Sequence, residues 1–158
     1  MIANIETTFK CNFETVVKNL NKSSTHKYIS SPMLTFTPTN TKDYSGNWVD
    51  GEVKVRMKLF DRISIGKQVF RIQKIQENHK DEYIIRDNGY GELAHRWDHW
   101  VFVRKTGKEN KTTYIDRIEV KAGILTIFVW LFANIFYRWR QFRWKKLIKN
   151  SFKQLETM

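Results

Sequence analysis

The chain has 158 residues, of which 41% are hydrophobic and 28% are charged, and its formal net charge is +12. This length and composition exclude a disordered chain and one embedded throughout in a membrane, and they predict a single domain over residues 1–158. The positive charge permits binding to nucleic acid, anionic lipid or acidic ligands, and it does not select among them.

Cysteine usage and the first residues bear on the cellular compartment. Cys11 is the only cysteine, so the sequence predicts neither an intrachain disulfide nor a cysteine-based zinc site. The opening stretch MIANIETTFK contains Glu6 and lacks a basic start followed by an apolar run, so we expect no secretory signal. Together these features favour a cytoplasmic protein.

The first third of the chain predicts one strand and one helix. IANIETTF mixes β-branched and aromatic residues, which is typical of a strand. NFETVVKNLN begins with the N-cap residue Asn12, carries Val16 and Leu20 at helical spacing, and predicts a helix that ends near Asn21. Residues 22–47 are polar and contain both prolines, so they predict mostly loop with one helical turn.

Extended segments fill the middle of the chain. In EVKVRMKLF, the apolar residues Val53, Val55 and Met57 alternate with basic ones, which predicts a half-buried strand. KQVFRIQKI places Phe70 and Ile72 on one strand face. EYIIRDNGYG predicts a strand that runs into an Asp-Asn-Gly turn, and LAHRWDHWVFVRK and TTYIDRIEV predict two strands joined by the hairpin loop KTGKEN. Short turns between strands predict an antiparallel, meander-like sheet.

After Gly123 the hydrophobic period changes from two to between three and four, which predicts one long helix. Its expected buried stripe consists of Phe128, Leu131, Phe132, Ile135, Trp139 and Phe142. We expect its basic residues to form a solvated outer face: Arg138, Arg140, Arg143, Lys145 and Lys146. The uncharged run 122–137 is shorter than the roughly 20 residues of a membrane-spanning helix. The helix should therefore cover one face of the sheet, in an α+β architecture.

Two segments resemble a known superfamily. IIRDNGYGELAHRWDH carries an aspartate, a glycine and a W-x-H element, here Asp87, Gly91, Trp97 and His99. TTYIDRIEVKAG carries a T-x-x-x-D-x-apolar strand that leads into a long helix, here Thr112, Asp116 and Ile118. With its element order, the chain resembles the SRPBCC superfamily, which includes START, birch-pollen-allergen-like and polyketide cyclase/dehydratase-related proteins.

The resemblance implies the α+β helix-grip fold, in which a curved antiparallel sheet wraps around a long C-terminal helix and short helices follow the first strand. A cavity often lies between sheet and helix in these proteins. Members include lipid carriers, hormone binders, quinone-binding proteins, cyclases and dehydratases, so the fold alone does not choose a function.

We expect the protein to bind a small hydrophobic ligand, lipid-, quinone- or polyketide-like, between an aromatic sheet face and the aromatic helix. The candidate lining residues are Met57, Phe70, Tyr83, Trp97, His99, Asp116, Ile118, Phe128, Phe132 and Ile135. No cofactor is expected. No metal is expected either, because His95 and His99 lie four residues apart on a strand, with Cα atoms roughly 13 Å apart.

His99 and Asp116 are polar residues on strand faces that are otherwise apolar. Buried polar groups need partners, so the two side chains either brace the sheet or orient the polar end of a ligand. A third interpretation makes them a catalytic pair in an enzyme of the cyclase or dehydratase type, in which His99 transfers a proton. We favour a binding protein over an enzyme.

The basic end of the long helix has two further interpretations. RWRQFRWKK alternates cations with aromatic residues, as nucleic-acid grooves do, but Trp139 and Phe142 belong to the expected buried stripe and no nucleic-acid motif accompanies them. We expect no nucleic-acid partner. A lipid carrier that docks on an anionic membrane stays an alternative, and the candidate contacts are Arg140, Arg143, Lys145 and Lys146.

Overall fold

Seven β-strands form one antiparallel sheet in the computed structural model, which describes residues 1–40, 46–75 and 80–156. The strands are β1 (Ile2–Phe9), β2 (Leu34–Pro38), β3 (Gly51–Leu59), β4 (Ile63–Ile75), β5 (Glu82–Gly91), β6 (Arg96–Lys105) and β7 (Thr112–Lys121). Their order across the sheet is β1-β7-β6-β5-β4-β3-β2, so β2 to β7 form a meander and β1 pairs with the last strand.

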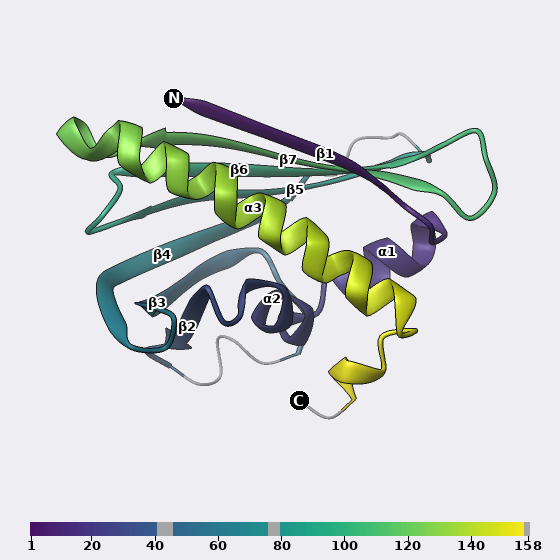
Figure 1. Cartoon of the computed structure of the whole chain (residues 1–158), viewed down its shortest axis with the longest axis horizontal. Coiled ribbons are helices and arrows are strands. Elements are labelled where there is room, and N and C mark those ends of the chain that lie inside the picture. The colour runs from purple at the N-terminus through teal and green to yellow at the C-terminus, as the bar shows by residue number, and fades with distance from the viewer. Residues whose placement is uncertain (41–45, 76–79, 157–158) are drawn as a thin grey trace.

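The helices are α1 (Phe13–Leu20), α2 (Ser23–Ser30) and α3 (Thr126–Lys149), with 3-10 turns η2 (Gly123–Leu125) and η3 (Lys153–Leu155) on either side of α3. Figure 1 shows α3 lying across one face of the curved sheet, where it contacts β1, β7 and α2. Gly123 has a φ angle of 57°, a conformation that costs glycine little, and it turns the chain from β7 towards α3. The predicted α+β helix-grip architecture is confirmed.

The predicted first helix is confirmed as α1, with the expected cap. The side-chain oxygen of Asn12 accepts a hydrogen bond from the backbone N–H of Thr15 at 2.8 Å, which satisfies one of the unpaired donors of the first turn. Val16 and Leu20 are buried in the core. The helix ends at Leu20, and the cap residue is Asn21.

The prediction of a loop with one helical turn for residues 22–47 is wrong. Ser23–Ser30 form helix α2 and Leu34–Pro38 form strand β2. The buried face of α2 carries Thr25 beside a single large aliphatic residue, Ile29, so the hydrophobic pattern of this helix is too weak to identify it. Residues 41–45 of the segment lie outside the described residues.

The predicted Asp-Asn-Gly turn is also wrong, because β5 continues through it to Gly91. Gly89 pairs with Trp97 of β6, and the connection between the two strands is residues 92–95. A Cβ atom at Gly89 would lie 2.7 Å from the carbonyl oxygen of Val69 on β4. This glycine therefore permits two strands to approach closely, and it does not form a turn.

The predicted rotation of the long helix about its axis is wrong. Phe128 and Ile135, which were expected in the buried stripe, are 67% and 62% exposed, and Leu131 and Phe142 are exposed as well. The buried face consists of Val129, Ala133, Phe136, Tyr137, Arg140, Gln141, Trp144 and Leu147. Two polar residues interrupt this face, so apolar periodicity selected the wrong side of the helix. None of the helices in the described part of the chain is long and apolar enough to span a bilayer.

The rotation of α3 can be tested with one substitution made on both of its faces. Leu147 is fully buried and Leu131 is exposed. Leu147→Ala should lower the free energy of unfolding by about 2–5 kcal/mol, because it leaves a cavity in the core. Leu131→Ala should lower it by less than about 1 kcal/mol. Urea unfolding of both variants measures the difference, and equal losses would contradict this orientation of the helix.

Candidate functional site

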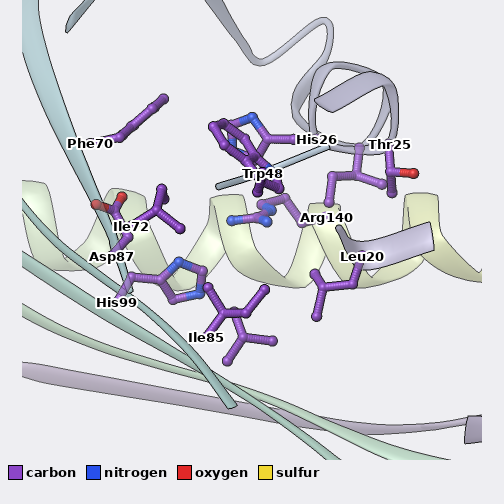
Figure 2. Close-up of a pocket in the computed structure, with 12 residues that line it drawn as sticks. Leu20, Thr25, His26, Trp48, Phe70, Ile72, Ile85, Asp87, His99 and Arg140 are labelled. Carbon is purple, nitrogen blue, oxygen red and sulfur yellow. The ribbon is translucent and has the colours of Figure 1, made fainter. Parts of the chain in front are cut away.

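Two adjacent chambers lie between the sheet and the helices α2 and α3, and each has a volume of about 50 Å³. Five residues line both chambers: His26, Phe70, Asp87, His99 and Arg140. Figure 2 shows the first chamber, with the guanidinium of Arg140 directed into the space between His26 and His99. Four elements, α2, β5, β6 and α3, thus bring titratable groups to the junction of the chambers.

The second chamber extends from this junction to an apolar end. Its apolar lining includes Phe36, Met57, Leu93, Trp97, Phe132 and Phe136. The indole N–H of Trp97 donates to the hydroxyl of Tyr137 at 3.2 Å, which ties β6 to α3 at this end. Leu93, Trp97 and Phe132 are only partly buried, so they form the part of the chamber wall nearest to solvent.

Asp116 joins three parts of the fold. One of its carboxylate oxygens lies 2.8 Å from Nε2 of His99 on β6, and the other accepts a hydrogen bond from Nε2 of Gln141 on α3 at 2.9 Å. The same amide nitrogen of Gln141 donates to the backbone carbonyl of Ile5 on β1 at 2.9 Å. Asp116 is fully buried and lines neither chamber, so it acts on a bound molecule only through His99.

His99 is neutral in this environment. Burial lowers its pKa below the ordinary value, although the hydrogen bond to Asp116 opposes that shift. A neutral imidazole that donates from Nε2 to the carboxylate leaves Nδ1 as a hydrogen-bond acceptor. His99 can therefore accept a hydrogen bond from a ligand or take a proton from it.

Arg140 was expected on the solvated outer face, and this expectation is wrong, because the side chain is 4% exposed. Its guanidinium carbon lies 4.9 Å from the ring centre of Tyr137, in a cation–π contact. Burial opposes the charge, but Tyr137 and Asp116 favour it, and the net effect raises the pKa of Arg140. The residue is thus a permanent positive charge at the junction of the chambers.

Two more titratable groups face this charge. Burial raises the pKa of Asp87 to about 7, although a hydrogen bond from the backbone N–H of Arg71 at 2.8 Å and the charge of Arg140 oppose the shift. Burial lowers the pKa of His26 well below its ordinary value. Near neutral pH the junction therefore holds one arginine cation, two neutral imidazoles and a carboxyl group that is close to its midpoint.

The structure brings together some of the residues expected from the sequence and separates others. Those that line the chambers are Met57, Phe70, Trp97, His99 and Phe132. Ile118 and Asp116 are buried behind the chamber walls, and Tyr83 donates from its hydroxyl to Asn21 at 2.8 Å, away from both chambers. The expectation that Phe128 and Ile135 face the interior is wrong, because both lie on the exposed face of α3.

The residues predicted from the sequence to line the site did not include His26, Arg140 or Asp87. Asp87 was named only as part of the motif that resembles the superfamily. His26 lies in the segment that was expected to be loop. Arg140 carried a detectable signal, because Ala133, Tyr137 and Trp144 precede and follow it at steps of three and four. That stripe has a charge at its centre, and an arginine is almost never fully buried without a partner. The stripe was therefore not expected to be the buried face of the helix.

The fold is shared with solved bacterial proteins of low sequence identity. The chain is similar to a conserved protein from Geobacillus kaustophilus, with a TM-score of 0.60 and 14% identity over 96% of this chain and 97% of the other. It is similar to a protein from Arthrobacter aurescens, with a TM-score of 0.64 and 12% identity over 94% and 86% of the two chains. A START superfamily protein from Mycobacterium smegmatis gives a TM-score of 0.54 and 9% identity over 98% of each chain.

No family model and no curated protein matches the sequence. The structural matches show that the chain shares the helix-grip fold of these proteins. They do not transfer a function, because one fold supports many different sites. The chemistry of this protein therefore depends on the side chains at the chambers.

The raised pKa of Asp87 predicts a specific pH dependence of stability. In the unfolded chain this carboxyl ionises near pH 4, whereas in the folded protein it holds its proton up to about pH 7. The folded state binds more protons in this window, so the contribution of Asp87 to stability falls as pH rises from about 4 to 7. Asp87→Asn should therefore stabilise the protein, by about 2–4 kcal/mol at pH 8 and by less at pH 5.

Urea unfolding at pH 5 and pH 8 measures this difference. Glu109→Gln, which removes an exposed carboxyl in the β6–β7 hairpin, is the control and should follow the wild-type profile. An Asp87→Asn profile parallel to that of the wild type would contradict the proposed ionisation of Asp87.

Proposed function

We propose that this protein binds a small hydrophobic ligand in the two chambers between the sheet and α3. The observation that carries the proposal is the polarity of this space. Titratable groups from four elements meet at one end, and aromatic and aliphatic side chains line the other. Ligand pockets typically combine an apolar lining with a few convergent polar groups that fix orientation.

The size of the chambers constrains how such a ligand enters. Each chamber holds about 50 Å³, whereas pockets for drug-sized ligands have about 300–1,000 Å³. A ligand larger than a few atoms must therefore displace part of the wall. The half-buried side chains of Leu93, Trp97 and Phe132 stand at the apolar end, and we propose that their rotation opens the second chamber.

An enzyme of the cyclase or dehydratase type is the rival proposal. Nε2 of His99 is hydrogen-bonded to Asp116, so Nδ1 remains available as a base beside the chamber. That geometry suits abstraction of an acidic proton from a bound ligand. Turnover of polyketide-like substrates that persisted unchanged in His99→Gln would remove His99 from any such mechanism.

Ligand binding is tested with the neutral hydrophobic dye 1-aminoanthracene and with native mass spectrometry. Ala94 is buried and lines the second chamber, so Ala94→Phe should fill that space and weaken dye binding at least tenfold. Ile63→Phe adds an aromatic ring at an exposed position of β4 that lines neither chamber, and it should leave dye binding unchanged. Equal binding by both variants and the wild type would place the dye on the surface and contradict the proposal.

A second candidate function is contact with an anionic membrane surface, and the exposed face of α3 favours it. Its N-terminal half and the preceding turn η2 present large apolar side chains to solvent: Ile124, Ile127, Phe128, Leu131 and Ile135. Its C-terminal half presents the cations Arg138, Lys145, Lys146 and Lys149. We propose that the apolar half inserts at the lipid interface while the cations bind anionic headgroups.

Two of the residues expected at this contact are unavailable. Arg140 is buried, and Arg143 lies with its guanidinium carbon 3.8 Å from the ring centre of Tyr28 and donates to the Tyr28 carbonyl. Of the four cations expected at this contact, Lys145 and Lys146 are exposed, and Arg138 and Lys149 join them on the same helix. A second copy of the chain is a less suitable partner than lipid, because each copy carries a net charge of +12.

Co-sedimentation with vesicles of phosphatidylcholine and phosphatidylserine tests the membrane proposal. Leu131→Ser combined with Ile135→Ser should abolish binding, and Lys145→Gln combined with Lys146→Gln should weaken it about tenfold or more at low salt. The control, Lys108→Gln with Lys111→Gln, removes two charges from the β6–β7 hairpin and should have little effect. Equal losses from both lysine pairs would indicate attraction by net charge alone and contradict a contact through α3.

A further inference from the structure

Arg140 is a buried cation at the junction of the two chambers. It is 4% exposed, and its Nε has no hydrogen-bond partner. Among the described residues, none of the ion pairs includes Arg140. Taking a charge out of water costs several kcal/mol unless partners compensate for the lost hydration. Tyr137 and Asp116 favour the charge of Arg140, but neither of them accepts a hydrogen bond from its Nε.

The two nearby acids do not supply the missing charge. Asp116 already accepts hydrogen bonds on both oxygens, from His99 and Gln141. Asp87 accepts from the backbone N–H of Arg71 and is close to its ionisation midpoint at neutral pH. Neither carboxylate forms an ion pair with Arg140, so a negative charge from outside the protein would complete the junction.

The surroundings of Arg140 match a single planar anion. The ring of Tyr137 covers one face of the guanidinium at 4.9 Å from its carbon, and the Nε–H at its edge has no hydrogen-bond partner. His26 and His99 on either side are neutral, because burial lowers the pKa of each. The arginine fork pairs with a carboxylate through two parallel hydrogen bonds, and a chamber of about 50 Å³ has room for a group of that size.

We propose that the ligand is an apolar monocarboxylic acid, whose carboxylate pairs with Arg140 where the chambers meet and whose hydrocarbon part extends between Phe132 and Trp97. This inference rests on the proposed ligand-binding function and specifies the chemical class of the ligand. It also gives the buried arginine a role, because the ligand neutralises its charge on entry. The requirement for a negative end group separates such ligands from sterols, alcohols and other neutral lipids.

The test compares octanoate with 1-octanol, which have the same chain length and differ in the charged end group. Both are titrated by displacement of 1-aminoanthracene from the wild-type protein. Octanoate should bind at least tenfold more tightly, as expected for one charge-assisted pair. Arg140→Met, which has a similar length and no charge, should reduce the preference to less than threefold and retain dye binding. Arg56→Met, on the exposed face of β3, should keep the wild-type preference.

A labelled ligand supplies a readout that does not depend on affinity. The NMR signal of [1-¹³C]octanoate, followed as a function of pH, should show that bound octanoate has a lower pKa than free octanoate in the wild type. This depression should be lost in Arg140→Met and kept in Arg140→Lys. If Arg140→Met does not fold, the wild-type comparison of octanoate with 1-octanol and the Arg140→Lys titration decide the question.

The outcomes separate this inference from the function on which it rests. Equal affinities of the wild type for octanoate and 1-octanol, with the dye still bound in the chambers, would overturn the carboxylate pairing and leave the ligand-binding function standing. Failure of the dye, octanoate and 1-octanol to bind would overturn both.

Discussion

The packing of α3 against the sheet depends on a buried hydrogen-bond network centred on Asp116. Its two oxygens bind His99 on β6 and Gln141 on α3, and Gln141 also donates to the carbonyl of Ile5 on β1. Asp116 and Gln141 are buried, and an unsatisfied carboxylate or amide in the interior would be costly. This network therefore favours one rotation of the helix about its axis, which apolar packing alone would not select.

That rotation determines what each face of α3 presents. With Gln141 directed to Asp116, the adjacent Arg140 enters the space between the helices and the sheet. The same rotation directs Phe128 and Ile135 to solvent. The polar end of the chambers and the apolar strip on the outside of the helix are thus two consequences of one set of hydrogen bonds.

The fold and the site have different origins in this chain. Solved proteins with 14% identity or less share the helix-grip architecture, because many sequences can alternate polar and apolar residues along a meander of strands. The cluster of His26, Asp87 and Arg140 is a property of individual side chains. A function inferred for this protein therefore depends on that cluster and on the chambers beside it.

The sequence by itself determined the strands from β3 to β7, the capped helix α1 and the long C-terminal helix. Each of these has a local signal: alternation in Val53, Val55 and Met57, the N-cap Asn12, and the change of period after Gly123. Helix α2 had no such signal, because its buried face is mostly small and polar. The apolar stripe of Ala133, Tyr137 and Trp144 contains Arg140, but only the tertiary structure decided that Arg140 and Gln141 are buried. A polar residue is buried where distant partners satisfy it, and Asp116, His99 and Ile5 are brought to Gln141 only when the sheet has formed.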